Sequence, residues 1–180
     1  FYVLLGIILA AISAISIRFF HWQSEVWHHR VKMWLPLETA ITGALVGIVG
    51  VYFPQILGSS EAFMHDVLTG HFEGTILFLL FLCVLKLVIT EISQGGGFVG
   101  GVFAPTLFMG IAFGSAYGQV LNRLVTGFEM GNPQAYGIAG MAGLLAGIVR
   151  APITAILLVF ELTSDYRLIL PIMLTSVVCT

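Results

Sequence analysis

A cluster of glycines followed by a proline interrupts the uncharged stretch between Ile92 and Asn122. The cluster reads Gly95-Gly96-Gly97-Phe98-Val99-Gly100-Gly101-Val102-Phe103-Ala104-Pro105. Glycine permits positive φ values and leaves backbone N–H groups uncovered. Proline suits the first turn of a helix, because the N–H that it lacks would have no partner there. We therefore expect one helix to end in the glycines and a second helix to restart after Phe103.

The restarted helix offers the chemistry of an anion site. Its N-terminus presents unpaired N–H donors and about half a positive charge from the helix dipole. A partial charge suits an anion that must also be released, since a buried Lys or Arg would hold it too firmly. The predicted site comprises Gly101, Val102, Phe103, Ala104 and Pro105, with the amides of Val102 and Phe103 as ligands. On composition alone, a kink or a re-entrant packing loop explains the same glycines equally well.

The surrounding sequence has the composition of a membrane protein. Of its 180 residues, 58% are hydrophobic and 9% are charged, and the mean hydropathy is +1.03, whereas soluble domains contain about 25% charged residues. Backbone groups inside a bilayer must bond internally, which leaves helices or a closed barrel. The apolar runs lack the alternation of barrel strands. We predict an all-α, polytopic membrane protein with tilted, partly spanning and broken helices.

The uncharged runs differ widely in length, although a straight spanning helix needs about 20 apolar residues. Runs that span or nearly span are 1–17 and 39–60, and shorter or interrupted runs are 74–85, 92–122, 131–149, 151–160 and 168–180. Segments interrupted by Gly or Pro are typical of discontinuous helices that meet around a binding site near the midplane. Polar loops are expected at His21–Glu38, Glu61–Glu73 and Arg123–Pro133.

Small residues four positions apart predict close packing between helices. Three groups have this spacing: Gly43 and Gly47; Gly110, Gly114 and Gly118; Gly143 and Gly147. Such residues share one helix face and let two backbones approach each other in lipid. We expect these glycines to serve packing, with no direct part in binding.

Two ionisable residues lie in or beside the same apolar run. Lys86 and Glu91 are five residues apart and so point about 140° apart on a helix. We therefore expect no mutual ion pair. Pairing with other helices, or a place near the membrane interface, is the favoured role for both residues, and lining of an anion route is the alternative.

The segment around Arg150 and Glu161 is expected to be architectural. Arg150, two residues before Pro152, should lie at the start of a helix with its side chain snorkelling to the interface; attraction of anions to a vestibule is the alternative. Glu161 should lie near a helix end. Ser164 or Asp165 is expected to cap the helix that starts near Tyr166.

No metal, cofactor or nucleic-acid site is predicted. The histidines lie in polar loops or at helix ends: His21, His28, His29, His65 and His71. None has a metal-binding spacing inside an apolar helix. Cys83 and Cys179 lie in apolar runs and are expected to pack as small hydrophobes. The net charge of −2, with no basic cluster, argues against a nucleic-acid partner.

Several segments resemble the CLC family of chloride channels and chloride/proton exchangers. Gly101–Pro105 resembles the G-x-F-x-P signature of that family, and GGVFAPTLFMGIAFGSAYG resembles the helix that follows it. Arg150–Thr154 is similar to the R-A-P-[LI]-T step and Phe160–Thr163 to the F-E-[LM]-T step. The segment ITGALVGIVGVYFPQILG resembles the opening of the second inverted repeat. The resemblance covers essentially the whole chain, in the order of the family.

The resemblance implies a partial CLC-type transmembrane domain over residues 1–180. Residues 1–38 would be the last helix of the first half with a loop, and 39–180 most of the second repeat. It implies transport of chloride or a similar small anion as substrate, without a cofactor, by a multi-pass protein of the lipid bilayer, the cell membrane in a prokaryote. It also implies a homodimer that forms through residues near 1–20 and 166–180.

The resemblance leaves channel and antiporter undistinguished. The serine loop and the gating-glutamate loop of the family belong to its first half, and its pore tyrosine lies beyond Thr180; Tyr166 occupies a different place. The chain opens on Phe1 and stops inside an apolar run, so we expect it to be part of a longer protein.

Other classes of protein fit less well. A cation carrier would place carboxylates or carbonyls at the helix break, but residues 94–105 contain no acid. An intramembrane protease would need a nucleophile and a base; Ser115 lies between glycines, yet its spacing is not G-x-S-x-G and no histidine lies in an apolar run. A structural membrane fragment remains a third alternative.

Overall fold

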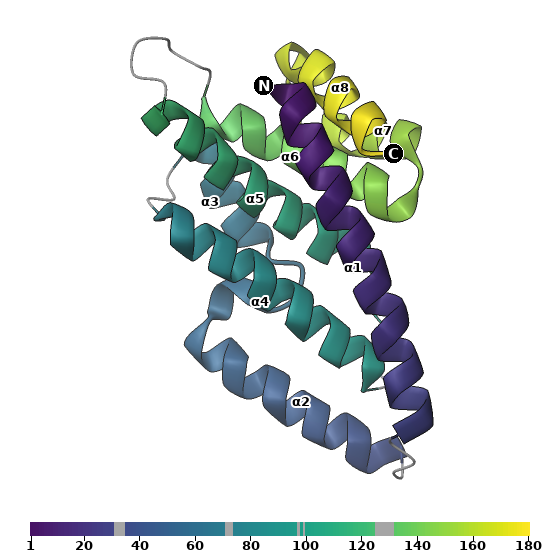
Figure 1. The fold of residues 1–180 in the computed structure, drawn as a ribbon. Coiled ribbons are helices and arrows are strands. Elements are labelled where there is room, and N and C mark those ends of the chain that lie inside the picture. The colour runs from purple at the N-terminus through teal and green to yellow at the C-terminus, as the bar shows by residue number, and fades with distance from the viewer. Residues whose placement is uncertain (31–34, 71–73, 97, 99, 125–131) are drawn as a thin grey trace.

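Helices make up all the regular secondary structure of the described residues. In the computed structural model these are residues 1–30, 35–70, 74–96, 98, 100–124 and 132–180, with side chains described outside 22–38. The α-helices are α1 (Tyr2–Arg30), α2 (Leu35–Tyr52), α3 (Glu61–Thr69), α4 (Ile76–Gly95), α5 (Phe103–Leu124), α6 (Pro133–Val149), α7 (Pro152–Thr163) and α8 (Ile169–Cys179) (Figure 1). Two 3-10 helices are η1 (Pro54–Ile56) and η2 (Tyr166–Leu168). The predicted all-α class is confirmed.

The expected break in the glycine cluster is present. Helix α4 ends at Gly95 and α5 begins at Phe103. The predicted polar loops were partly wrong, because α1 continues to Arg30 and α2 already begins at Leu35. Helix α3 occupies most of the loop predicted at 61–73. It buries Phe63 and Val67, which are four residues apart and share one face of this short helix, and its Met64 and Leu68 are partly buried against the core.

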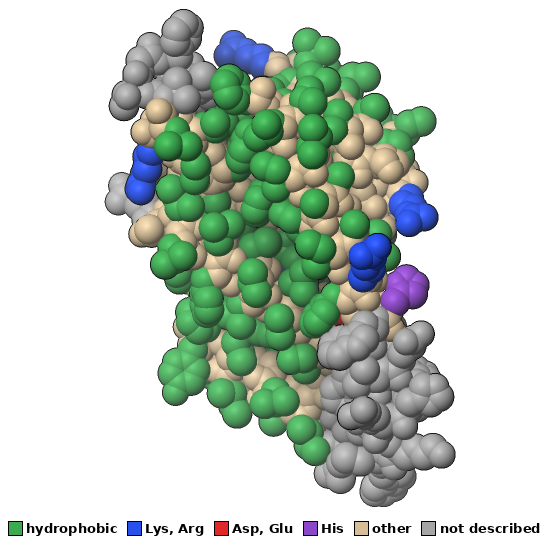
Figure 2. Space-filling model, in the orientation of Figure 1, with side chains coloured by type: hydrophobic (Ala, Val, Ile, Leu, Met, Phe, Trp, Pro, Cys, Tyr) green, Lys and Arg blue, Asp and Glu red, His purple; other side chains and the backbone are tan. Residues whose placement is uncertain are grey.

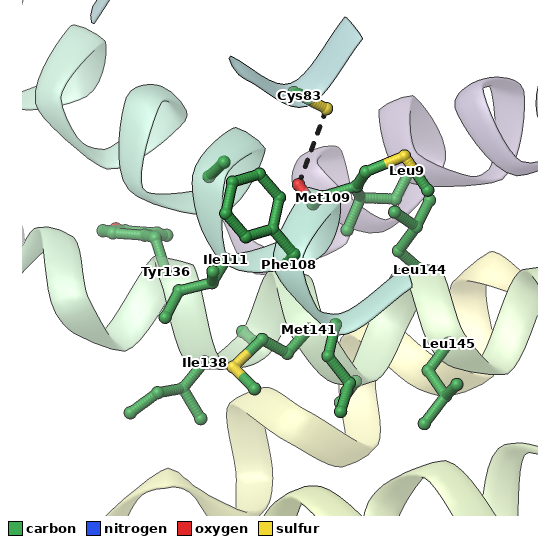
Figure 3. Close-up of a cluster of buried hydrophobic side chains, with 14 of the residues drawn as sticks. Leu9, Cys83, Phe108, Met109, Ile111, Tyr136, Ile138, Met141, Leu144 and Leu145 are labelled. Atoms are coloured by element: carbon green, nitrogen blue, oxygen red, sulfur yellow. Dashed lines mark hydrogen bonds between the residues drawn. The ribbon is translucent and has the colours of Figure 1, made fainter. Parts of the chain in front are cut away.

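Helices α5 and α6 pack backbone to backbone at the centre of the structure. A Cβ atom added to Gly110 would lie 2.6 Å from the carbonyl oxygen of Gly140 and 2.6 Å from Cα of Met141. Further along, a Cβ on Gly118 would lie 2.9 Å from Cα of Pro133. Figure 3 shows buried side chains that these two helices contribute to the core, among them Phe108 of α5 and Met141 of α6. The packing role predicted for the α5 glycines is confirmed.

Helix α6 also packs against α1 and α8. A Cβ on Gly143 would lie 2.9 Å from Cδ1 of Leu9, and a Cβ on Gly147 would lie 2.7 Å from Sγ of Cys179. The hydroxyl of Thr175 on α8 lies 2.9 Å from the carbonyl oxygen of Ala139 on α6. Neither glycine of the α2 pair meets another helix among the described residues: a Cβ on Gly43 would meet only the ring of Phe98, at 3.3 Å, and a Cβ on Gly47 would meet nothing within 4 Å.

The outer surface is largely apolar. Two helical segments among the described residues are long and apolar enough to cross a membrane, Tyr2–His21 and Ile76–Gly95. Figure 2 shows hydrophobic side chains over most of the visible face, with Lys, Arg and His at its margins. This distribution fits a protein whose middle contacts lipid and whose ends contact water.

Candidate functional site

The described glycines of the break have two kinds of surroundings: Gly96 packs closely against α2, and Gly100 and Gly101 border open space. Positive φ values among the described glycines occur at Gly58 and Gly70, so the expectation of positive φ is wrong for Gly95, Gly96, Gly100 and Gly101. A Cβ on Gly96 would collide with the side chain of Thr42 on α2. A Cβ on Gly100 or Gly101 would meet nothing within 4 Å. The chain before α5 therefore borders free space.

The first turn of α5 has the geometry of a helix start. The carbonyl oxygen of Val102 accepts hydrogen bonds from the backbone N–H of Thr106 at 3.1 Å and from its hydroxyl at 2.7 Å. The amides of Val102, Phe103 and Ala104 precede this first bonded N–H, in positions that have no partner within the helix. Pro105 is buried and brings no N–H. The predicted helix N-terminus is therefore present, and 46% of the Phe103 surface is exposed there.

A cavity of about 460 Å³ lies in front of this helix start. Its walls come from α2, from residues 56–59, from α4 and from the start of α5. Of the five predicted site residues, the cavity is lined by Gly101, Phe103, Ala104 and Pro105. Val102, which is half-buried, is not among its lining residues. The structure thus brings four of the five residues to one cavity.

Lys86 lies in the wall of this cavity with only 3% of its surface exposed. Its Nζ donates to the carbonyl oxygens of Ile56 at 2.6 Å and Gly58 at 2.9 Å. A third bond reaches Oγ of Ser60 at 3.0 Å. The ammonium also lies 5.3 Å from the centre of the Phe108 ring. The predicted pairing with another part of the chain is confirmed for Lys86, which in addition lines the cavity.

The positive charge of Lys86 has neutral hydrogen-bond partners. All three acceptors of its ammonium are carbonyl or hydroxyl oxygens. Among the described residues that line the cavity, none is acidic. In a low-dielectric interior such a charge acts over a longer distance than in water. Lys86 and the N-terminal end of the α5 dipole therefore contribute positive charge at the cavity, while the C-terminal end of the α4 dipole contributes partial negative charge.

Glu91 is also buried, with 2% of its surface exposed, but it does not line the cavity. Its Oε1 has no hydrogen-bond partner. Because the three donors of Lys86 are bonded to residues 56–60, the expectation that Lys86 and Glu91 do not pair is confirmed.

The helix ends predicted near the C-terminus are confirmed, whereas the snorkelling of the Arg150 side chain stays a prediction. Arg150 is exposed and forms the left-handed C-cap of α6 at φ 56°, directly before α7. Ser164 ends α7 in the same conformation, at φ 51°. Asp165 caps η2, because its Oδ1 accepts the N–H of Arg167 at 2.9 Å. Tyr166 packs its ring edge-on against Phe160, with 5.1 Å between ring centres.

The other residues weighed from the sequence form no site in the part of the chain that is described. Ser115 is buried between α5 and α6, and its hydroxyl has no hydrogen-bond partner. No group of three His, Cys, Asp or Glu side chains is placed to hold a metal there. His28, His29 and His71 lie outside the residues whose side chains are described.

Sequence reasoning missed Gln94 and the segment 56–59 as walls of the cavity. For Gln94 a signal was available, because a polar amide stands at the end of an apolar helix directly before the glycines. Residues 56–59 gave no such signal, since they reach the cavity only through the fold.

Comparison with known proteins identifies relatives along the whole chain. The family described as "Voltage gated chloride channel" matches residues 1–180. The H(+)/Cl(-) exchange transporter ClcA of Vibrio parahaemolyticus is 43% identical over 136 residues, which cover 76% of this chain and 28% of the relative. Chloride channel protein CLC-f of Arabidopsis thaliana is 35% identical over 184 residues, which cover 96% of this chain and 23% of the relative.

A third relative is the putative chloride channel protein ClcB-like of Ralstonia nicotianae, which is 34% identical over 148 residues. That match covers 82% of this chain and 34% of the relative. The chain thus spans about a quarter to a third of the length of these relatives. Since the family match extends from the first residue to the last, the chain belongs to the voltage gated chloride channel family.

Proposed function

We propose that this protein carries chloride or a similar small anion across a membrane. The anion is held in front of α5 by backbone amides of the segment Gly101–Pro105. The observation that carries the proposal is the position of the helix start: Phe103 and Ala104 of its first turn line a 460 Å³ cavity in which no described lining residue is acidic. An anion there interacts with N–H donors and with the positive end of the helix dipole.

The electrostatics of the cavity favour an anion over a cation. The full charge of Lys86 and the partial charge of the α5 N-terminus have the same sign. The donors of Lys86 are spent on Ile56, Gly58 and Ser60, so the ammonium attracts an anion without contacting it. Weak, indirect attraction lets the ion leave again, as transport requires.

The names of the relatives include an exchange transporter and chloride channel proteins. Membership of their family supports a transport function over an enzymatic one. Both transport modes, channel and chloride/proton antiporter, are compatible with the site. We place the protein in the membrane as a multi-pass protein, with 1–38 as the end of a first half and 39–180 as most of a second repeat.

We propose a homodimer that forms through residues near 1–20 and 166–180. Helices α1 and α8 lie side by side (Figure 1) and pack against each other. Both carry large exposed apolar side chains: Val3, Leu4, Ile7 and Ile15 on α1, and Leu170, Met173, Leu174 and Val177 on α8. A shared apolar face of this kind suits contact with a second copy or with lipid.

The experiment that tests the amide site compares two substitutions at Phe103 in the full-length protein, reconstituted in liposomes. Phe103→Pro removes the N–H but is compatible with the first helical position. Phe103→Ala removes the same ring and keeps the N–H. A hydrogen bond to a charged group contributes about 1.5 to 3 kcal/mol, so we expect Phe103→Pro to raise the half-saturation concentration for chloride about tenfold or more above that of Phe103→Ala.

Proton movement is followed in the same liposomes. Stoichiometric proton counter-movement identifies an antiporter, and sustained chloride flux without it identifies a channel. Equal half-saturation concentrations for the two Phe103 variants would refute the amide site. Absence of flux of chloride and nitrate through the wild-type protein would refute the transport function itself.

A further inference from the structure

The side-chain amide of Gln94 is a buried donor at the wall of the cavity. Its Nε2 atom is buried and has no hydrogen-bond partner among the described residues. The residue lines the cavity together with Gly101, Phe103 and Pro105. Leaving a buried donor unpaired costs about 1 to 3 kcal/mol, and folded proteins pair nearly all such groups. Because this nitrogen has almost no accessible surface while Gln94 as a whole is half-buried, a turn of the side chain would bring the donor to an acceptor in the cavity.

The other polar side chains that α4 contributes to this wall have already used their donors. Thr90 donates its hydroxyl hydrogen to the carbonyl oxygen of Lys86 at 2.8 Å. Ser93 does the same to the carbonyl oxygen of Ile89 at 2.8 Å. Lys86 donates to residues 56, 58 and 60. Of the described α4 side chains at this wall, Gln94 alone has a donor that is not committed to the protein.

Gln94 and the start of α5 contribute to opposite sides of the break. Gln94 lies in the last turn of α4, while Phe103 and Ala104 open α5 on the other side of the glycines. Both sides reach the same cavity. An acceptor between them can receive an amide hydrogen from a side chain and others from the backbone. A neutral amide orients such an ion without adding a charge that would retain it.

The nearest competing acceptor in the sequence is Glu91, three residues before Gln94 on the same helix. Residues at this spacing are neighbours on a helix surface. The Oε1 of Glu91 is also unpaired, so the two groups are not bonded to each other in the structure. Gln94 lines the cavity and Glu91 does not. The position of the amide thus favours a ligand in the cavity over this carboxylate.

We propose that Gln94 is a ligand of the transported anion, and that its Nε2 donates to chloride or a similar small monovalent anion held before α5. The inference rests on the proposed function and extends it from backbone donors to a side-chain donor. It makes Gln94 a residue that determines affinity and selectivity among anions, because this donor depends on the type of side chain, whereas every residue except proline provides a backbone N–H.

The test is chloride binding to the purified full-length protein by isothermal titration, paired with flux into liposomes. Gln94→Leu removes the donor, and Gln94→Met is a second donor-free variant that packs differently. Gln94→Glu keeps the shape and replaces the donor by acceptors. We expect the dissociation constant and the half-saturation concentration for chloride to rise about tenfold or more in Gln94→Leu and Gln94→Met, since a hydrogen bond to an ion is lost. In Gln94→Glu, chloride binding should be lost.

The matched control is Thr90→Val, which changes a polar residue of the same wall whose hydrogen is already bonded to its own helix. It should leave both constants within about twofold of the wild type, because no donor to the anion is removed. Glu91→Gln tests whether Gln94 donates to the anion or to the carboxylate of Glu91. If it raises the constants as far as Gln94→Leu does, the amide serves the carboxylate and the proposal is wrong.

The outcomes separate this inference from the proposed function. A wild-type protein that binds and carries chloride, together with unchanged constants in folded Gln94→Leu and Gln94→Met, overturns only the role of Gln94. A wild-type protein that neither binds nor carries small anions overturns both. A rise confined to the Gln94 variants supports the inference.

Discussion

The ammonium of Lys86 lies 2.6 Å from the carbonyl oxygen of Ile56, thirty residues earlier in the chain. Together with the bonds to Gly58 and Ser60, this contact ties the segment after α2 to the middle of α4. Residues 56–59 form one wall of the cavity in front of α5. Lys86 therefore shapes the cavity as well as charging it.

Replacement of Lys86 tests both roles. Lys86→Met removes three hydrogen bonds and leaves their acceptors buried, so we expect a loss of about 2 to 4 kcal/mol in the free energy of unfolding. Lys86→Arg keeps the charge and some of the donors and should lose less. Thermal unfolding of the full-length protein in detergent measures both. Equal losses in the two variants would mean that the size of the side chain, and not its donors, matters here.

Substitution of Gly110 should disturb the α5–α6 contact. Gly110→Ala places a Cβ within 2.6 Å of the backbone of α6 and forces the helices apart, which should cost about 1 to 3 kcal/mol. Gly47→Ala is the control, because its Cβ meets nothing within 4 Å; it should be neutral or stabilise by up to about 1 kcal/mol. Unfolding midpoints report the difference. A stable Gly110→Ala protein would show that the helices separate at little cost.

Thr175 joins α8 to α6 through its hydroxyl. Thr175→Val removes the bond to the carbonyl oxygen of Ala139, while an alternative acceptor within α8, Pro171, lies at the same 2.9 Å. We expect a loss of about 0.5 to 1.5 kcal/mol, in the range of interhelical hydrogen bonds in membranes. Thr163→Val is matched to it, because Thr163 bonds only within α7, and should cost less. A larger effect at Thr163 would contradict the interhelical role.

Asn132 begins α6 as its N-cap. Its side-chain oxygen accepts the N–H of Gln134 at 3.3 Å. Asn132→Ala should lower the free energy of unfolding by about 1 kcal/mol, and Asn132→Ser should retain most of it. Chemical denaturation of the two variants measures this. No difference between them would indicate that Pro133 alone starts the helix.

The sequence predicted those features of the fold that depend on residues close together in the chain. The glycines and Pro105 predicted the break before Phe103, and the spacing of Gly110 and Gly114 predicted the close face of α5, because both effects depend on residues adjacent in sequence or one turn apart. Helix α3 was missed, since its apolar face consists mainly of Phe63 and Val67 in a polar segment. Four of the five predicted site residues reach the cavity.

The remaining features depend on contacts between distant segments. The sequence could not reveal that Lys86 bonds to Ile56 and Gly58, because no local pattern marks a backbone carbonyl as an acceptor for a side chain 28 to 30 residues away. The same holds for Thr42, which makes Gly96 necessary across the interface of α2 and α4. Gln94 became a candidate only when the cavity was located.

The meeting of Gly110 with Gly140 has a mechanical consequence. Because no side chain separates the two backbones, α5 and α6 cannot shift past each other by rearranging side chains between them, and packed interiors resist continuous deformation. The first turn of α5 thus belongs to a rigid pair of helices. Any change in the width of the cavity would then have to come from its other walls, residues 56–59 and the end of α4, while the first turn of α5 stays in place.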